Sequence, residues 1–142
     1  MIDAATRETL ADAYLAAFDA ATRLAALPSS QLPGFDLDAA FGVADVLRSR
    51  RIARGERQVG WKIGFTNRGI WDRYGVHAPI WGPVYDTTTT LLDGTAADVS
   101  LAGLCQPRLE PEVVLHLARV PQAGMTTAEL AGCIDWVAHG FE

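Results

Sequence analysis

The chain has little lysine and cysteine, and it has no basic excess. Its 142 residues include 12 Lys and Arg together against 17 Asp and Glu, which gives a formal net charge of −5. Domains that bind nucleic acid usually carry the opposite balance, so the composition argues against a nucleic-acid partner. No run of about 18 apolar residues is present, and we therefore expect no membrane span.

The two cysteines and the single lysine have simple explanations. Cys105 and Cys133 fit no redox or metal-binding spacing, and the N-terminus shows no secretory signal, so we expect reduced thiols in a cytoplasmic protein. Lys62 is the only lysine. Coding bias toward arginine explains that scarcity. Alternatively, Lys62 occupies a position where arginine cannot substitute, because lysine can release its proton when its surroundings lower its pKa.

Two amphipathic helices are predicted before residue 58. The first spans 4–27, where apolar residues recur at spacings of three and four, with Asp3 or Thr6 as the cap and Pro28 as the end. The second runs from about Leu37 to Arg54.

The second helix has clear boundary signals. Asp36 is the predicted N-cap, and Gly55 is the predicted end. An arginine cluster surrounds that end, and we interpret it as a solvated face that complements the helix dipole, rather than as an anion or partner site. Its members are Arg48, Arg50, Arg51, Arg54 and Arg57.

The hydrophobic period changes from helical to alternating after residue 58. A strand over 59–65 has one apolar face, and its other face holds Lys62 between two glycines, which leaves room for a ligand. Thr126 and Glu129 form a predicted capping box for a later helix. The remaining predicted elements are a helix at 68–74, an irregular loop at 75–86, a strand at 84–92, a strand at 108–117 and a helix at 127–139.

Two glutamates stand two residues apart on the strand predicted at 108–117. The side-chain period of two puts Glu110 and Glu112 on one face, within reach of a single cation, and carboxylate oxygens suit magnesium or manganese. Pro111 between them lacks an N–H group and predicts an edge or bulge. Two solvated glutamates on a wet face would give the same pattern.

Two segments resemble a known family. Residues 60–66 read Gly-Trp-Lys-Ile-Gly-Phe-Thr, and residues 106–112 read Gln-Pro-Arg-Leu-Glu-Pro-Glu. Together with Asp38-Ala39-Ala40-Phe41, they resemble the amino-terminal half of the 2-keto-4-pentenoate hydratase / 4-oxalocrotonate decarboxylase family, within the fumarylacetoacetase superfamily. The resemblance implies an α+β fold, with helices at 1–57 followed at 58–142 by the first part of a mixed, β-rich catalytic domain, incomplete at its C-terminus.

The resemblance also implies a metal site and a reaction. Glu110, Glu112 and Glu142 match the family's three acidic ligands for Mg²⁺ or Mn²⁺, with the third expected after a helix. Lys62 matches a residue near the substrate's 2-oxygen, where it acts either as an electrostatic stabiliser or as a proton shuttle. Gly64, Thr66 and Arg108 are the matching substrate-binding positions. The substrates would be small 2-keto or 2-hydroxydienoate acids from aromatic catabolism, which a hydratase hydrates and a decarboxylase decarboxylates.

The chain departs from the family in two respects. The loop Gly-Val-His-Ala-Pro-Ile-Trp-Gly at 75–82 lacks two acidic residues that the family commonly has, which leaves His77 as a candidate proton carrier. Family members are also much longer, so we expect a fragment of a longer protein, a second chain that completes the fold or a degenerate remnant. A homo-oligomer would also cover an incomplete core. The leading interpretation of the function is a metal-dependent hydratase. The alternatives to it are a decarboxylase, a fumarylacetoacetase-type carbon–carbon hydrolase and a non-catalytic partner subunit.

Overall fold

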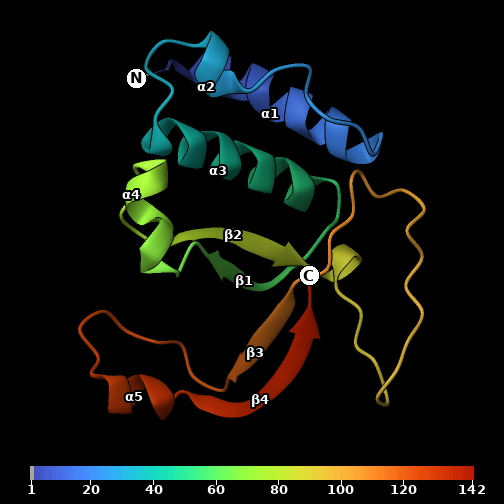
Figure 1. The fold of residues 1–142 in the computed structure, drawn as a ribbon, viewed down its shortest axis with the longest axis vertical. Coiled ribbons are helices and arrows are strands. Elements are labelled where there is room, and N and C mark those ends of the chain that lie inside the picture. Colours follow the sequence, from blue (N-terminus) through green and yellow to red (C-terminus); the bar gives the residue numbers. More distant parts are fainter. Residues whose placement is uncertain (1) are drawn as a thin grey trace. The chain divides into compact units, whose positions relative to one another are not determined.

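The computed structural model describes residues 2–142, an α+β arrangement of helices followed by small sheets (Figure 1). The chain divides into two compact units, one ending at Cys105 and the other running from Gln106 to Glu142. The predicted domain boundary between residues 57 and 58 is a different division and stays a prediction. The elements are α1 (Ala4–Asp19), α2 (Pro28–Gln31), α3 (Leu37–Ala53), β1 (Gln58–Gly64), η1 (Arg68–Ile70), α4 (Trp71–Tyr74), β2 (Ile80–Tyr85), η2 (Asp86–Thr88), β3 (Pro111–Leu117), α5 (Thr127–Ala131) and β4 (Ile134–Phe141).

Helices α1 and α3 enclose the core of the first unit. Both predicted caps form, since the Asp3 carboxylate accepts the Thr6 N–H at 2.8 Å and the Asp36 carboxylate accepts the Ala39 N–H at 2.8 Å. The two helices lie side by side in Figure 1, and the buried side chains come from both of them and from the N-terminus. These buried residues are Ile2, Ala11, Ala39 and Val43. Within residues 2–142, no helix has the length and apolar character that crossing a membrane requires.

The first helix ends eight residues earlier than predicted. It stops at Asp19, and Ala21 adopts a left-handed φ of 50° while its N–H bonds to Phe18 and that of Thr22 bonds to Ala17. This bonding pattern is a Schellman cap, which normally carries glycine at the left-handed position. Alanine at this position gives no sequence signal for a helix end, so the predicted helix extended to residue 27, just before Pro28. That proline instead begins α2, where a missing N–H costs nothing.

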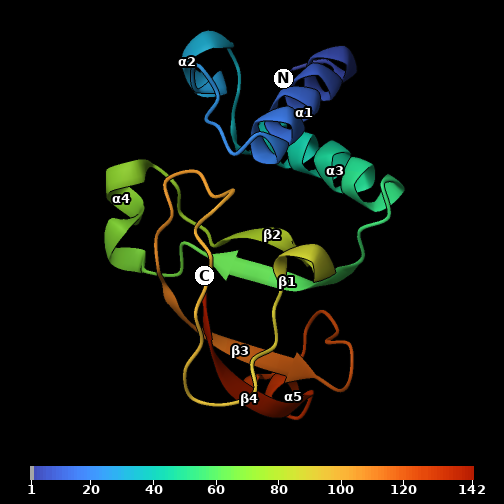
Figure 2. The same ribbon diagram turned by 90° about the vertical axis from the view of Figure 1, so that its right-hand side faces the viewer.

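Helix α3 matches its prediction closely, because its cap has the expected residue. Gly55 takes the left-handed position with a φ of 100°, and its N–H bonds to Ile52 while that of Glu56 bonds to Arg51. Figure 2 shows α3 between α1 and the β1–β2 hairpin. One aromatic contact connects α3 to β2. Phe41 stacks on Trp81 with ring centroids 4.4 Å apart.

Strand β2 begins earlier than predicted. The expected strand at 84–92 is wrong, because β2 covers Ile80–Tyr85 and pairs antiparallel with β1, with Lys62 opposite Gly82. Glycine and Pro83 made this segment look like a loop. A proline is nevertheless tolerated in an edge strand, and both strands of a two-stranded sheet are edges.

The second unit is a β-hairpin with one short helix. The capping box of Thr126 and Glu129 forms as predicted, but α5 ends at Ala131 instead of His139. Gly132 caps it, and Ile134–Phe141 forms β4, which pairs antiparallel with β3. The predicted helix therefore included residues that belong to β4. That segment contains β-branched and aromatic residues, which favour a strand.

The arginine cluster is occupied by ion pairs and hydrogen bonds within the first unit. Arg51 and Arg54 both bind the Glu56 carboxylate, whose side chain is only 6% exposed, and Thr87 donates to the same carboxylate at 2.7 Å. The hydrogen bond from Arg51 is the main reason that the pKa of Glu56 falls to about 2. The cluster thus joins the end of α3 to η2. Because the Arg51 side chain is only 11% exposed, the predicted solvated face is wrong at this position.

We predict that Glu56→Gln destabilises the protein by about 3 kcal/mol, because it leaves two arginines facing a neutral group in a buried site. Since folding lowers the pKa of Glu56, its contribution is complete above about pH 4.5 and is lost as the pH falls toward 2. Urea unfolding at pH 7 and pH 3 measures both effects.

Glu8→Gln is the matched control, because Glu8 of α1 also pairs with an arginine of α3, Arg50, but its side chain is 56% exposed. It should change the free energy of unfolding by less than about 1 kcal/mol. Equal losses from the two variants would contradict the role assigned to Glu56.

Candidate metal centre

The hairpin register places Glu110 directly opposite Glu142. Each residue donates its backbone N–H to the other's carbonyl, at 2.7 Å from Glu110 and 2.9 Å from Glu142. This reciprocal pair extends the β3–β4 ladder past the strands' ends. Two side chains opposite each other on an antiparallel ladder lie on the same face. Glu142 therefore reaches the site from a strand and not, as predicted, from the end of a helix.

Glu112 completes a group of three carboxylates. It lies two residues after Glu110 on the same face, and one carboxylate oxygen from each of Glu110, Glu112 and Glu142 lies within 4.8 Å of the others. Glu112 is half-buried, whereas the other two are exposed. Three anionic oxygens at this spacing are a donor set that suits a hard divalent cation. The residues that the sequence suggested as ligands thus converge.

Pro111 interrupts neither the ladder nor the site. It is paired with Phe141 between the Glu110–Glu142 and Glu112–Gly140 pairs. Because Glu110 and Glu142 exchange both hydrogen bonds, the next pair along is a non-hydrogen-bonded one, and its backbone nitrogens point away from the partner strand. The missing N–H of Pro111 therefore falls on the outer edge of the hairpin, as the sequence predicted.

Gly140 is required where Glu112 meets β4. A Cβ atom at position 140 would lie 2.8 Å from Cγ2 of Val114, closer than folded proteins allow. Val114 is β-branched and stiff, so it cannot move aside easily. A glycine opposite Glu112 therefore lets the two strands keep the register that brings the carboxylates together.

The remaining predicted site residues divide between the two units. Arg108 precedes β3 in the second unit, and Lys62, Gly64 and Thr66 belong to β1 or directly follow it in the first. Lys62 is half-buried. A Cβ built on Gly82, opposite it, or on Gly60, beside it, meets nothing within 4 Å. This face of β1–β2 therefore has space near Lys62.

His77 lies in the first unit, in the turn before β2. Its Nδ1 atom is 3.7 Å from a carboxylate oxygen of Asp72, and its ring meets Trp71 edge to face at 6.4 Å. The side chain is 63% exposed. A proton-carrying role for His77 remains a prediction.

A histidine–carboxylate pair on the hairpin was missed by sequence reasoning. Nδ1 of His116 lies 2.5 Å from Asp135, and the imidazole stacks on Trp136 at 4.7 Å. The hydrogen bond from His116 lowers the pKa of Asp135. Asp135 reaches His116 because the register shifts between His116 and Leu117, and such a bulge re-aims a side chain. A bulge of this kind leaves no clear sequence signal.

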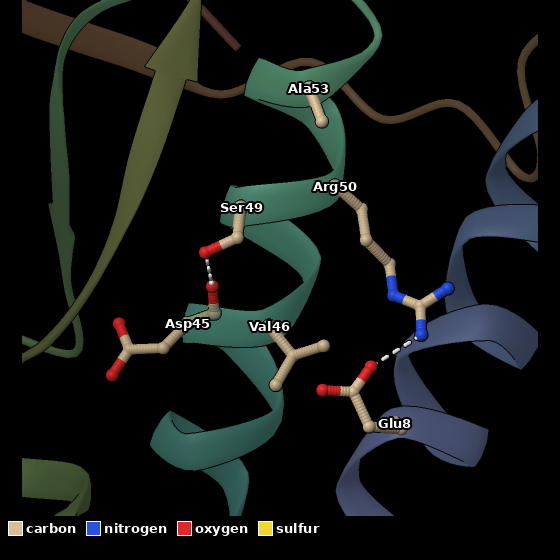
Figure 3. Close-up of a pocket in the computed structure, with 6 residues that line it drawn as sticks. All are labelled: Glu8, Asp45, Val46, Ser49, Arg50 and Ala53. Atoms are coloured by element: carbon tan, nitrogen blue, oxygen red, sulfur yellow. Dashed lines mark hydrogen bonds and ion pairs between the residues drawn. The ribbon is translucent and has the colours of Figure 1, made fainter.

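A surface pocket between α1 and α3 contains none of the predicted site residues. Figure 3 shows its lining, in which Arg50 pairs with Glu8 across the two helices. The Ser49 hydroxyl donates to the Asp45 carbonyl within α3. Arg50, Glu8 and the Ser49 hydroxyl are thus already engaged within the first unit, and the carboxylate group on the hairpin is the better candidate site. The full lining is Glu8, Asp45, Val46, Ser49, Arg50 and Ala53.

The chain is related in sequence to hydratases and decarboxylases. A 2-hydroxyhexa-2,4-dienoate hydratase of Comamonas testosteroni is 33% identical over 136 residues, which cover 95% of this chain and 51% of that protein. A 4-oxalocrotonate decarboxylase of a Pseudomonas species is 33% identical over 115 residues, which cover 79% of this chain and 44% of that protein.

A solved structure shares the fold. The 4-oxalocrotonate decarboxylase from Pseudomonas putida G7, complexed with magnesium and adipate, matches with a TM-score of 0.85 at 25% identity, over 100% of this chain and 53% of that one. A second structure of that enzyme, with calcium and acetate, matches with a TM-score of 0.80 at 25% identity, over 96% of this chain and 52% of that one.

These findings confirm the resemblance to the 2-keto-4-pentenoate hydratase / 4-oxalocrotonate decarboxylase family. The chain spans about half the length of the curated relatives it matches. No protein-family model matches it.

We predict that Gly140→Ala disturbs the carboxylate group, because the new methyl group collides with Val114. Hydrogen exchange at the amides of Glu110 and Glu142, which bond to each other's carbonyls, should become at least about tenfold faster, equivalent to about 1.4 kcal/mol.

Removing the colliding methyl groups should reverse the effect. The double variant Gly140→Ala, Val114→Ala is therefore expected to recover much of the lost protection. Gly60→Ala is the control, because a Cβ at that position meets nothing within 4 Å. Unchanged protection in Gly140→Ala would show that the contact does not hold the register.

Proposed function

We propose that this chain supplies the divalent-metal site of a lyase that acts on 2-hydroxy-2,4-dienoate or 2-keto-4-pentenoate-type acids in aromatic catabolism. The observation that carries the proposal is the convergence of Glu110, Glu112 and Glu142 on one face of the hairpin. The names of the relatives, which are hydratases and decarboxylases, support the substrate class.

Three carboxylates with oxygen atoms 4.8 Å apart or less fit a hard cation. We propose that Glu110, Glu112 and Glu142 hold Mg²⁺ or Mn²⁺. Such an ion, when bound, supplies Lewis-acid stabilisation of negative charge that develops on the substrate's 2-oxygen. Two related structures carry magnesium or calcium, which supports a divalent ion of this kind.

The other predicted residues act on the substrate in this proposal. Lys62 provides positive charge at the developing enolate oxygen and exchanges a proton there, a task that arginine cannot take over at neutral pH. Arg108 offers a planar guanidinium that suits the substrate carboxylate. Gly64 and Thr66 bind the substrate at the end of β1, and His77 serves as a proton carrier.

The choice among hydration, decarboxylation and hydrolysis depends on which bond breaks after the enolate forms. Hydration adds water to the remaining double bond, and decarboxylation releases carbon dioxide from a dicarboxylic relative of the substrate. A carbon–carbon hydrolase needs a positioned base for water. The pairing of His116 with Asp135 supports this alternative, because a carboxylate orients an imidazole for a role as general base.

A non-catalytic role is the alternative from another class. A partner subunit would need the surfaces of this chain but not a working metal site. We also propose a cytoplasmic protein that works as a homo-oligomer or with a complementing chain, which agrees with its coverage of about half of its relatives.

We predict that the chain binds Mg²⁺ or Mn²⁺ saturably in isothermal titration, and that Glu110→Gln, Glu112→Gln abolishes this binding because two of the three anionic ligands are lost. Glu129→Gln is the matched control, since Glu129 lies in the same unit and glutamine preserves its capping box.

A 2-hydroxydienoate should then be consumed with the metal present, and the substrate's absorbance reports this directly. Equal metal binding by the parent and the double variant would exclude the carboxylate site. Retained folding with no metal binding by the parent would favour the partner-subunit alternative.

A further inference from the structure

Phe65 has a backbone conformation that a bulky side chain rarely adopts. Its φ is 58°, in the left-handed region, where the Cβ atom crowds the neighbouring carbonyl oxygen. Within residues 2–142, the other non-glycine residues with a positive φ are Ala21 and Gln106. The helix cap explains Ala21, whereas Phe65 directly follows a strand, β1. A residue of this kind keeps its conformation only where its surroundings hold it, and such residues concentrate at functional sites.

Trp71 supplies the contact that holds Phe65. Its indole N–H donates a hydrogen bond of 2.9 Å to the Phe65 carbonyl, and this bond is partly buried. Tyr74 adds an edge-to-face contact, with its ring centroid 5.7 Å from that of Phe65. Trp71 and Tyr74 are the first and last residues of α4, which follows β1 and precedes β2 (Figure 1). One short helix therefore fixes both the carbonyl and the ring of Phe65.

The left-handed turn at Phe65 sets the direction of Thr66. In an unbroken strand, Thr66 would continue the row of Lys62 and Gly64 along one face. The ladder instead ends at Gly64, which pairs with Ile80, and Thr66 is exposed beyond it. Within residues 2–142, neither the backbone N–H nor the hydroxyl of Thr66 bonds to another group. Two donors on one residue suit a carboxylate ligand, provided that the turn that aims them is fixed.

The same indole contacts His77 on the other side of α4. The His77 ring meets Trp71 edge to face, with centroids 6.4 Å apart. Because Gly64 pairs with Ile80, the segments that carry Thr66 and His77 both lie at this end of the β1–β2 hairpin. Half-buried Trp71 thus connects the residue before Thr66 to His77.

We propose that Trp71 is a positioning residue for the binding of a small 2-keto acid at the end of β1. Its N–H holds the strained turn at Phe65 and so aims Thr66 at the substrate carboxylate, while its ring keeps His77 at the same end of the hairpin. The inference rests on the proposed function, in which Thr66 and His77 act on the substrate. Trp71 acts through these residues and does not itself touch the substrate.

The test titrates 2-oxopentanoate into the Mg²⁺-loaded chain by calorimetry. This probe carries the 2-keto acid group but has no double bond to hydrate. Trp71→Phe keeps an aromatic ring in α4 and removes the indole N–H, so it should raise the Kd of the probe at least about tenfold. Its Kd for Mg²⁺ should stay within about twofold of the parent's, since Trp71 contributes none of the three carboxylate ligands.

Trp81→Phe is the matched control for the loss of ring volume. Trp81 belongs to the same unit and pairs with Ile63, which puts it on the face of the β1–β2 hairpin away from Lys62. This variant should bind 2-oxopentanoate as the parent does.

A second substitution should restore the turn without the indole. Glycine adopts a left-handed φ without strain, so Phe65→Gly in the Trp71→Phe background should return the Kd of the probe to within about threefold of the parent's. The intraresidue NOE between the amide and α protons of Phe65 reports its positive φ directly. That NOE should be strong in the parent chain and weak in Trp71→Phe.

The contrary outcomes overturn the proposal. Unchanged probe binding by Trp71→Phe, equal weakening by Trp81→Phe, no rescue by glycine, or loss of Mg²⁺ and probe together in Trp71→Phe would each leave Trp71 as a packing residue. The parent chain separates this inference from the proposed function. If the parent does not bind the probe with Mg²⁺ present, the proposed function is refuted and the role of Trp71 with it. If the parent and Trp71→Phe bind it equally well, only the role of Trp71 is refuted.

Discussion

The reciprocal backbone pairing of Glu110 with Glu142 is the interaction on which the candidate site depends. It sets the register of β3 against β4, and with it the face on which the three carboxylates gather. A shift of one residue would move Glu142 to the opposite face, because side chains alternate along a strand. Gly140, opposite Glu112 on β4, helps to keep this register, since any side chain there would collide with Val114.

The same hairpin that positions the carboxylates does little to stabilise itself. Val113, Leu115, Val137 and Phe141 are all more than half exposed, and the only buried hydrophobic residue among residues 106–142 is Cys133. A metal site needs ligands that packing holds within a fraction of an ångström of their working positions. The geometry of the candidate metal site therefore depends on what holds this hairpin in place.

The first unit is stabilised in a different way. Its helices bury a small core, and a buried carboxylate, Glu56, joins the end of α3 to η2 through Arg51, Arg54 and Thr87. The sequence predicted a solvated face for the arginine-rich segment, rather than an anion site. Its side chains are instead committed to carboxylates and aromatic rings of the same unit, as with Arg51 over Tyr85 at 3.8 Å.

Local signals in the sequence determined the features that depend on only a few neighbouring residues. Asp3 and Asp36 cap their helices, Gly55 ends α3, Thr126 and Glu129 form their box, and Glu110 and Glu112 share a face. Each follows from the chemistry of one residue type or from the period of a strand. The motifs around Lys62 and Glu110 also indicated the family, which the comparisons confirm.

Only the tertiary structure decided the features that depend on pairing between distant segments. Ala21 takes a left-handed position that normally carries glycine, so the sequence did not indicate where α1 ends. Ile134–Phe141 became a strand because β3 offers it a partner, and that pairing brought Glu142 to Glu110. The bulge that turns Asp135 toward His116 arises in the same ladder. Register and bulges are properties of two strands together, and neither strand's sequence specifies them alone.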